Sequence, residues 1–200
     1  MGTTAAPAPG TQTASGPGRG GPASAGTYHA VMTGLAPLTA ESAAVIATWI
    51  RSRAEAVVAG GPQFPFPLTA EGMLAIAADP AWRVFTLSDG QGQVVATASL
   101  FAKEDGLLLR VGRVIVDPAR RGEGWGRRVM EELLALTDAE PSVRATELGV
   151  FTHNLLARAL YERLGYVRSE GSLTVDVEGE QWQTEEFTRP RRDSDTASSG

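Results

Sequence analysis

The alternation of hydrophobic and polar positions predicts two helices near the start of the folded part of the chain. Hydrophobic residues recur at helical spacing after Thr39, and the pentapeptide Pro-Leu-Thr-Ala-Glu occurs both there and around Thr69. In each copy the threonine can cap a helix, and the glutamate stands in the positively polarised first turn. Residues 60–67 lie between the two copies and are rich in Gly, Pro and Phe, which favours a stiff loop.

The pattern then becomes that of strands with two helices inserted among them. Residues 82–87 and 93–101 flank an Asp-Gly-Gln-Gly sequence that is typical of a hairpin, and a strand over 107–116 should end before Pro118. A helix is expected over 124–136, a strand over 145–151, a second helix over 154–164, and a hairpin over 172–188 that turns at 178–180. This order predicts a mixed α/β sheet.

Composition sets the limits of the folded domain within the 200 residues. Residues 1–26 are almost entirely Gly, Ala, Pro, Ser and Thr, so they have too little apolar side chain to offset the entropy of ordering, and we expect a disordered tail. That segment lacks the basic start and apolar run of a secretory signal. Residues 190–200 are polar and are expected to form a flexible tail. One domain is therefore predicted over residues 27–189.

Charge and residue counts exclude several functions. The chain has no cysteine and two histidines, which leaves little for a metal centre, and no metal is expected. No run of residues has the length and apolarity of a membrane span. The formal net charge of -5 disfavours broad binding of nucleic acid. A cytoplasmic enzyme or binding domain, monomeric or homodimeric, is the expectation that remains.

The most informative segment is the one in which the predicted strand over 107–116 runs into a glycine-spaced loop and then a helix. Glycines let the backbone approach a ligand closely, and the first N–H groups of a helix have no internal partner, so the segment can cradle a phosphate. It matches neither the P-loop nor the dinucleotide pattern, because Gly126 is followed by Arg127 and Arg128. An ordinary glycine-rich connection is the alternative.

The surroundings of this loop resemble the GNAT superfamily of acetyltransferases, whose acetyl-CoA loop reads Arg/Gln-x-x-Gly-x-Gly/Ala. Here the loop is Arg121-x-x-Gly124-x-Gly126, preceded by a Val-x-Val-Asp-Pro sequence. A second segment, Asn-Leu-Leu-Ala-Arg-Ala-Leu-Tyr-Glu-Arg-Leu-Gly-Tyr over residues 154–166, is similar to the superfamily's Asn-x-x-Ala-x-x-x-Tyr-x-x-x-Gly-Phe/Tyr. The resemblance covers residues 27–189 and implies a mixed, mostly antiparallel sheet with a splayed central parallel strand pair, flanked by about four helices.

The resemblance also implies a cosubstrate, acetyl-CoA, and roles for particular residues. The amides around Gly122, Gly124 and Gly126 would hold the pyrophosphate, and nearby arginines would add positive charge. The backbone of the strand would pair with the pantetheine arm, which Asn154 would also contact unless it only caps its helix. The residues so implicated for acetyl-CoA binding are Val114, Ile115, Val116, Arg121, Gly122, Gly124, Gly126, Arg127 and Asn154, with Arg120 and Arg128 as further cations.

For catalysis, the resemblance implies transfer of the acetyl group to a primary amine of a small molecule, protein or peptide by direct attack. The N–H of Val116 would stabilise the oxyanion, and Tyr161 would protonate the departing sulfur as general acid. A superfamily branch that acetylates ribosomal proteins carries a glutamate where this chain has Gly149, which argues against a close match to that branch. Glu104, Glu147, Asp117 and a chain of waters remain alternatives for the base.

The acceptor is not identified by the sequence. Five aromatic residues stand in the segments that build acceptor sites in the superfamily, and they either line a pocket or belong to the core. Arg51 and Arg53 favour an anionic acceptor, whereas the many carboxylates favour an amine or a peptide N-terminus. The five aromatics are Trp49, Phe64, Phe66, Trp82 and Trp182. Two other classes remain open: a noncatalytic acyl-CoA-binding sensor on the same fold, and a protein associated with nucleic acid.

Overall fold

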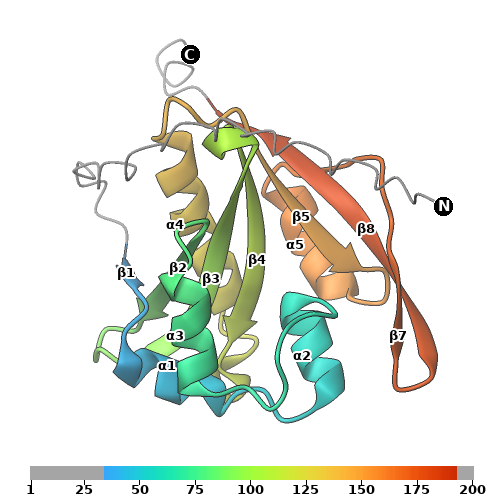
Figure 1. Ribbon diagram of the computed structural model, residues 1–200. Helices are drawn as coiled ribbons and strands as arrows, with labels where there is room; N and C mark the ends of the chain where they lie inside the picture. The colour runs from blue at the N-terminus through green and yellow to red at the C-terminus, as the bar shows by residue number, and fades with distance from the viewer. Residues whose placement is uncertain (1–33, 193–200) are drawn as a thin grey trace, which may run out of the picture.

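The computed structural model describes residues 34–192 of the chain. The predicted N-terminal tail and most of the predicted C-terminal tail lie outside the described residues. The strands, shown in Figure 1, are β1 (Leu35–Pro37), β2 (Trp82–Ser88), β3 (Val94–Lys103), β4 (Leu108–Val116), β5 (Ala145–Phe151), β6 (Val167–Arg168), β7 (Thr174–Val177) and β8 (Glu180–Pro190). The helices are α1 (Ala40–Ala47), α2 (Arg53–Gly60), α3 (Ala70–Ala78), α4 (Trp125–Asp138) and α5 (Leu155–Arg163).

The strands form one sheet in the order β1-β2-β3-β4-β5-β8-β6, and β7 pairs with β8 beside it. Every pairing is antiparallel except that of β4 with β5. These two parallel strands pair over three positions only, from Leu108 opposite Ala145 to Arg110 opposite Glu147. Beyond that point β4 and β5 diverge toward their C-terminal ends (Figure 1). The predicted mixed sheet with a splayed central pair is confirmed.

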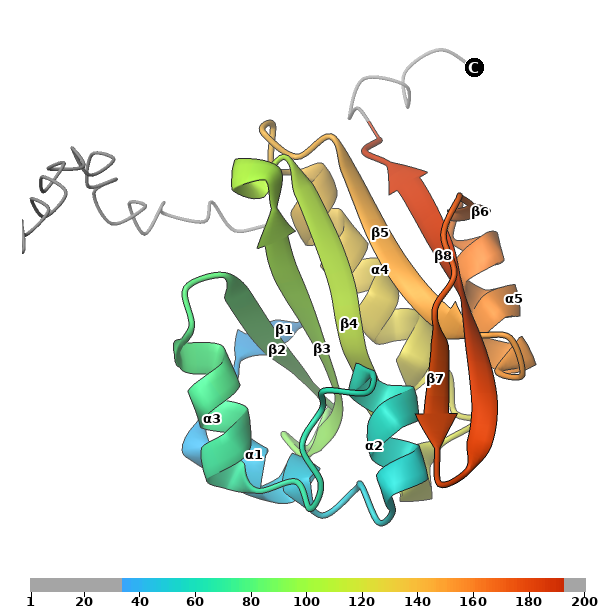
Figure 2. The ribbon, with the colours of Figure 1, turned by 45° about the vertical axis from the view of Figure 1, so that its right-hand side comes forward.

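The helices cover the two faces of the sheet in separate groups. Helices α1, α2 and α3 lie on one face, and α4 and α5 lie on the other (Figure 2). Helix α4 buries Val129, Met130 and Leu133 against the β2–β5 strands, whereas α1 and α3 build a second cluster around Ile46 and Met73. The gap between β4 and β5 is therefore bordered by different helices on its two sides.

Both threonine caps predicted from the sequence are present. Thr39 accepts a hydrogen bond from the N–H of Ser42 at the start of α1, and Thr69 accepts one from Gly72 at the start of α3. Helix α2 was not predicted from the sequence: three helices precede β2, whereas two were expected. Its start is capped by Ser52, and its buried side chains are Ala56 and Val57, too short an apolar stripe to register as helical periodicity.

Tertiary contacts stabilise α2 instead. The Arg53 guanidinium donates hydrogen bonds to the carbonyl oxygens of Phe64, at 2.6 Å, and of Pro62. At the other end of the helix, a Cβ on Gly60 would lie 2.4 Å from the ring of Phe64. The helix and the aromatic loop after it therefore form one unit. Arg53, which the sequence offered as a recognition group for an anionic acceptor, is used to hold this loop.

The C-terminal end of β8 is fixed by a buried arginine. Arg189 is 4% exposed and forms a bidentate pair with Asp138, at 2.9 and 2.7 Å, while its Nε donates to the carbonyl oxygen of Leu164. Burial of Asp138 opposes its ionisation, but the hydrogen bonds from Arg189 and from the Arg192 backbone outweigh it and lower the pKa of the carboxyl group. One ion pair thus links the ends of α4, α5 and β8.

We predict that Asp138→Asn lowers the free energy of unfolding by about 3 kcal/mol, because it leaves the buried Arg189 charge without a carboxylate. Urea denaturation measures the change. The folded-state pKa of Asp138 lies below its unfolded value, so the stabilisation is complete above that unfolded value, about 4, and is lost as the pH falls through the folded pKa. The difference between the two proteins should therefore narrow in acid.

The control is Glu131→Gln, which breaks the exposed pair between Arg127 and Glu131. This change should cost less than about 1 kcal/mol. Equal losses in the two variants would contradict the importance given to the Arg189–Asp138 pair.

Candidate active site

The parting of β4 from β5 leaves backbone groups of β4 without a strand partner. The N–H of Asp117 donates to the carbonyl oxygen of Val95, and Val116 stands opposite Ala96 in the register. Because N–H groups of successive residues in a strand point to opposite sides, the N–H of Val116 points away from β3 and into the gap. This is the group for which the sequence predicted an oxyanion role.

The glycine loop follows directly and leads into α4. Gly122 and Gly124 have φ values of 86° and 88°, a left-handed conformation that favours glycine. Gly124 is the N-cap of α4 and makes no side-chain capping bond, whereas α1, α2, α3 and α5 all have one. Within residues 34–192, α4 is thus the α-helix whose first N–H groups have no side-chain acceptor. Such a terminus is suited to an anion.

The arginines around the loop differ in how far their charge is neutralised. Arg120 pairs with Asp89 at 3.0 Å and with Glu123 at 2.8 Å. Arg127 and Arg128 pair with carboxylates one helical turn away, at 2.7 and 3.8 Å. Arg121 is exposed and forms no ion pair in the part of the chain that the structure describes. Of the four cations that the sequence placed near a phosphate, Arg121 is therefore the best available.

Asn154 and Tyr161 share one face of α5. The Asn154 Oδ1 accepts the N–H of Ala157 at 3.3 Å, so the capping role offered by the sequence is confirmed. Its amide nitrogen makes no hydrogen bond within residues 34–192 and remains available as a donor. The contact with the pantetheine arm stays a prediction.

The two tyrosines of the second motif have different surroundings. The hydroxyl of Tyr166 is buried and hydrogen-bonded to Thr146 at 2.8 Å. The Tyr161 ring packs against the core, with its centroid 6.0 Å from the centroid of the Tyr166 ring. The Tyr161 hydroxyl has no partner among the described residues. Burial raises the pKa of Tyr161 to about 12, so this group is protonated at neutral pH. The Tyr161 hydroxyl is therefore a protonated group that donates no hydrogen bond to the described residues.

None of the three candidate bases stands as a free carboxylate in the gap. Burial opposes ionisation of Glu147, but hydrogen bonds from Lys103 and Arg110 outweigh it and hold its pKa below the usual value. A carboxylate held in this way is a weak base. Asp117 caps the short 3₁₀ turn Pro118–Arg120 by accepting the Ala119 N–H. Glu104 lies in the turn Glu104–Gly106 between β3 and β4, at the end of β4 remote from the glycine loop.

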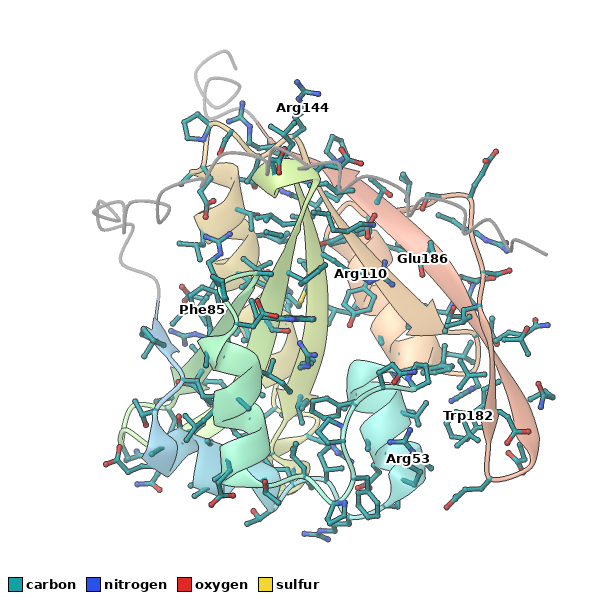
Figure 3. The ribbon with its side chains drawn as sticks, viewed as in Figure 1. Arg53, Phe85, Arg110, Arg144, Trp182 and Glu186 are labelled. Carbon is teal, nitrogen blue, oxygen red and sulfur yellow. The ribbon has the colours of Figure 1, made fainter. Side chains whose placement is uncertain are left out.

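The structure explains why position 149 carries no side chain. The guanidinium of Arg110 forms a bidentate pair with Glu186, at 2.8 and 3.0 Å, and the two side chains lie together on the face that also carries α1–α3 (Figure 3). A Cβ on Gly149 would lie 2.7 Å from Arg110 Nη2 and 2.9 Å from Glu186 Oε1. This ion pair was missed by the sequence analysis, although a glycine inside a strand is a known sign of such a close approach.

The five aromatic residues divide between core and surface. Trp49 and Phe64 are buried in the core, whereas Phe66 is 41% exposed. Trp182 lies on the β7–β8 hairpin, where its ring meets that of His153 edge-on at a centroid distance of 4.7 Å (Figure 3). Trp182 and His153 line an open hollow of about 480 Å³. The other residues that line it are Thr152, Glu180, Gln181 and Gln183. Of the five aromatics, Trp182 is the one that lines this hollow.

Two further observations concern partners and ions. No helix within residues 34–192 is long and apolar enough to cross a membrane. Over the same residues there is no cluster of three or more His, Asp or Glu side chains that could hold a metal ion.

Comparison with known proteins identifies the family. Residues 52–166 match the sequence profile of the Acetyltransferase (GNAT) family. The chain is 30% identical over 90 residues to a UPF0039 protein of Schizosaccharomyces pombe, an alignment that covers 45% of this chain and 58% of that relative. The chain thus spans little more than half the length of the curated relative. The profile match covers more than half of the 200 residues, and the protein belongs to the GNAT acetyltransferase family.

Solved structures share the fold. One is the spermidine N-acetyltransferase of Vibrio cholerae in complex with CoA and spermine, with a TM-score of 0.66 and 19% identity over 78% of this chain and 94% of that one. A GNAT-family acetyltransferase of Streptococcus pneumoniae gives a TM-score of 0.62 and 17% identity over 79% and 98% of the two chains. At these identities the likeness supports the overall fold alone.

We predict that Gly149→Ala disturbs the Arg110–Glu186 pair and that the two positions are energetically coupled. In the wild-type protein the added Cβ should displace the ion pair. In a Glu186→Ala background the clash with the Glu186 carboxylate is absent, so the same change should cost less stability. Denaturant unfolding of the four proteins in this cycle should give a coupling energy of about 1 kcal/mol. Gly90→Ala, where a Cβ meets nothing within 4 Å, is the control. Equal effects in both backgrounds would contradict the prediction.

Proposed function

We propose that this protein is an N-acetyltransferase that moves the acetyl group of acetyl-CoA to a primary amine of a small molecule or peptide. Membership of the GNAT acetyltransferase family supports the reaction type. The Vibrio cholerae structure of the same fold contains CoA together with an amine, which supports the two kinds of substrate. Attack takes place directly, with donor and acceptor bound together.

The observation that carries the proposal is that a helix without a side-chain cap follows a strand with one free edge. The last residues of β4 have no β5 partner, and the loop that follows them leads into α4, which begins without a side-chain cap. The amides around Gly122, Gly124 and Gly126 would hold the pyrophosphate, aided by Arg121 and Arg127. The free edge of β4 over Val114, Ile115 and Val116 would pair with the amide groups of the pantetheine arm, as an added strand does. The amide nitrogen of Asn154 would donate to the same arm.

Two groups of this chain would act on the reacting atoms. When the amine nitrogen attacks the thioester carbonyl carbon, negative charge develops on the carbonyl oxygen, and the Val116 N–H would donate a hydrogen bond to it. When the carbon–sulfur bond then breaks, the Tyr161 hydroxyl would give its proton to the sulfur. The proton lost by the attacking amine restores the tyrosine through solvent, so one proton is released and one is taken up. No side chain is assigned as the base.

The alternative is a noncatalytic acyl-CoA sensor on the same fold. A sensor needs the loop and the strand edge but has no use for a proton donor beside the sulfur. The unpartnered hydroxyl of Tyr161 therefore favours the enzyme. An assay of free thiol release from acetyl-CoA over a panel of primary amines separates the two functions, because a sensor releases no thiol above the rate without protein.

We predict that Gly126→Asp weakens acetyl-CoA binding by at least about tenfold without unfolding the protein. A Cβ at this position would lie 3.5 Å from Val116 Cγ2, an ordinary contact, so the protein itself can accommodate it. The added carboxylate in the first turn of α4 would compete with the pyrophosphate for the helix N–H groups and would repel it. Calorimetric titration measures the affinity. Gly90→Asp serves as the control, and unchanged affinity in Gly126→Asp would contradict the role of the loop.

We predict that Tyr161→Phe lowers kcat by about 100-fold or more, the usual contribution of a general acid, and leaves the Kd for acetyl-CoA nearly unchanged. In the parent, kcat/KM should rise with pH as the acceptor amine deprotonates. It should not fall again below about pH 11, because the pKa of Tyr161 is about 12. Steady-state kinetics across pH check both statements.

The matched control is Tyr166→Phe. This change removes the buried hydrogen bond to Thr146 and should cost about 1 kcal/mol of stability, with kcat retained while the protein is folded. Full turnover in Tyr161→Phe would remove that tyrosine from the mechanism.

A further inference from the structure

A strained residue lies on the stretch of β4 that has parted from β5. The stretch of β3 from Thr97 to Ser99 has three residues, while the opposing stretch of β4 from Gly112 to Ile115 has four. The bulge contains Arg113, whose φ of 51° is left-handed. Bulges re-aim side chains, and a left-handed conformation costs a non-glycine residue about 1 kcal/mol or more. The strained backbone at this bulge therefore sets the direction of the Arg113 side chain.

The guanidinium of Arg113 is held by aromatic rings. Its Cζ lies 3.6 Å from the ring centroid of Trp82 and 5.4 Å from that of Phe64. Such contacts stabilise a cation but do not neutralise its charge. The guanidinium carbon therefore lies over the indole ring, within contact distance.

The charge of Arg113 has no counterpart. Its one hydrogen bond within residues 34–192 is a long contact of 3.4 Å to Ser99 Oγ, its Nε is buried without a partner, and no ion pair with a carboxylate is formed there. Burial lowers the pKa of the guanidinium to about 10, so the surroundings disfavour the charged form that persists at neutral pH.

Three neighbouring cations on the same face have acceptors. Lys103 pairs with Glu147, Arg110 pairs with Glu147 and Glu186, and Arg53 donates to two carbonyl oxygens of the aromatic loop. Arg113 is therefore the cation of this group that lacks an acceptor of matching strength. A purely structural link between the sheet and the aromatic loop would not need a charge, because an apolar side chain packs there without the desolvation cost.

The position of Arg113 relates it to the acceptor. Phe64 belongs to the loop between α2 and α3, so the guanidinium lies on the face covered by α1–α3. The glycine loop leads into α4, which lies on the opposite face. An acceptor that enters the gap from the face opposite acetyl-CoA therefore meets Arg113 three residues from the Val116 N–H.

We propose that the acceptor amine carries a carboxylate group and that Arg113 binds this carboxylate. The inference rests on the proposed acetyl transfer and specifies its substrate class. A planar guanidinium can donate two parallel hydrogen bonds to a carboxylate, and its partly desolvated setting strengthens them. A polyamine such as spermine has only positive charges to offer and would be repelled at this position. The acceptor therefore differs from the amine bound by the Vibrio cholerae enzyme.

The experiment compares matched acceptors in the wild-type protein and in R113Q, R113K and R113M. Each pair consists of an amino acid and its primary carboxamide, such as 4-aminobutyrate and 4-aminobutanamide or β-alanine and β-alaninamide, with spermidine as a further acceptor. The ratio of variant to wild-type kcat/KM is taken for each compound, so that differences in amine reactivity within a pair cancel. R144Q is the control, since Arg144 is exposed and lies just before β5, at the end of the sheet remote from the bulge.

We expect the wild type to use carboxylate acceptors, and R113Q and R113M to lose about 10–100-fold in kcat/KM toward them, mainly through KM. The amides and spermidine should change less than twofold, and R113K should retain part of the activity because it keeps the charge. A uniform loss over all acceptors, or a wild-type preference for amides or spermidine, would overturn the inference and leave acetyl transfer standing.

A binding measurement separates the two proposals if no acceptor is turned over. Thermal shift in saturating CoA with the same pairs then reports the anion site alone. Stabilisation by the amino acids but not by their amides, lost in R113Q and R113M, supports the site even though the proposed reaction has failed. Absence of any shift with the carboxylates would overturn the site as well.

Discussion

The structure depends on the parting of two parallel strands after three paired positions. Strands β4 and β5 run together from Leu108 to Arg110 and then separate, which leaves a free edge on β4 in the middle of the sheet. Unpaired backbone groups inside a protein are costly unless a partner is found. We therefore propose that this edge pairs with an extended, amide-bearing ligand, and that the helix after β4 adds N–H groups at the point where such a ligand would carry its phosphates.

Ion pairs on the face that carries α1–α3 connect the strands beside the gap between β4 and β5. Arg110 occupies the last position at which β4 pairs with β5, and its ion pair with Glu186 connects β4 to β8 across the glycine at position 149. Glu147, paired with Lys103 and Arg110, belongs to the same network. These carboxylates are used to hold the strands, which explains why they are poor candidates for a catalytic base. Past this network the bulge of β4 turns Arg113 onto the aromatic rings.

The sequence predicted those parts of the fold whose signals are local. Alternation and turn residues identified β2 to β5 and the final hairpin, the two threonines identified the starts of α1 and α3, and the glycine spacing identified the loop that leads into α4. Helix α2 was missed because its two buried side chains give no periodicity and its stability comes from Arg53 bonding to a distant loop. The Arg113 bulge and the Arg110–Glu186 pair depend on how strands are registered, which no local pattern specifies.

The central claim is that acetyl-CoA binds along the free edge of β4 and at the start of α4. The most direct test is NMR titration of the ¹⁵N-labelled protein with acetyl-CoA, following the backbone amide signals of Val116, Gly124 and Gly126. If acetyl-CoA binds there, these three signals shift together and saturate with one equivalent of ligand, while the amide signals of α1 on the other face do not shift. Unchanged signals at all three positions, or shifts confined to α1–α3, would contradict it.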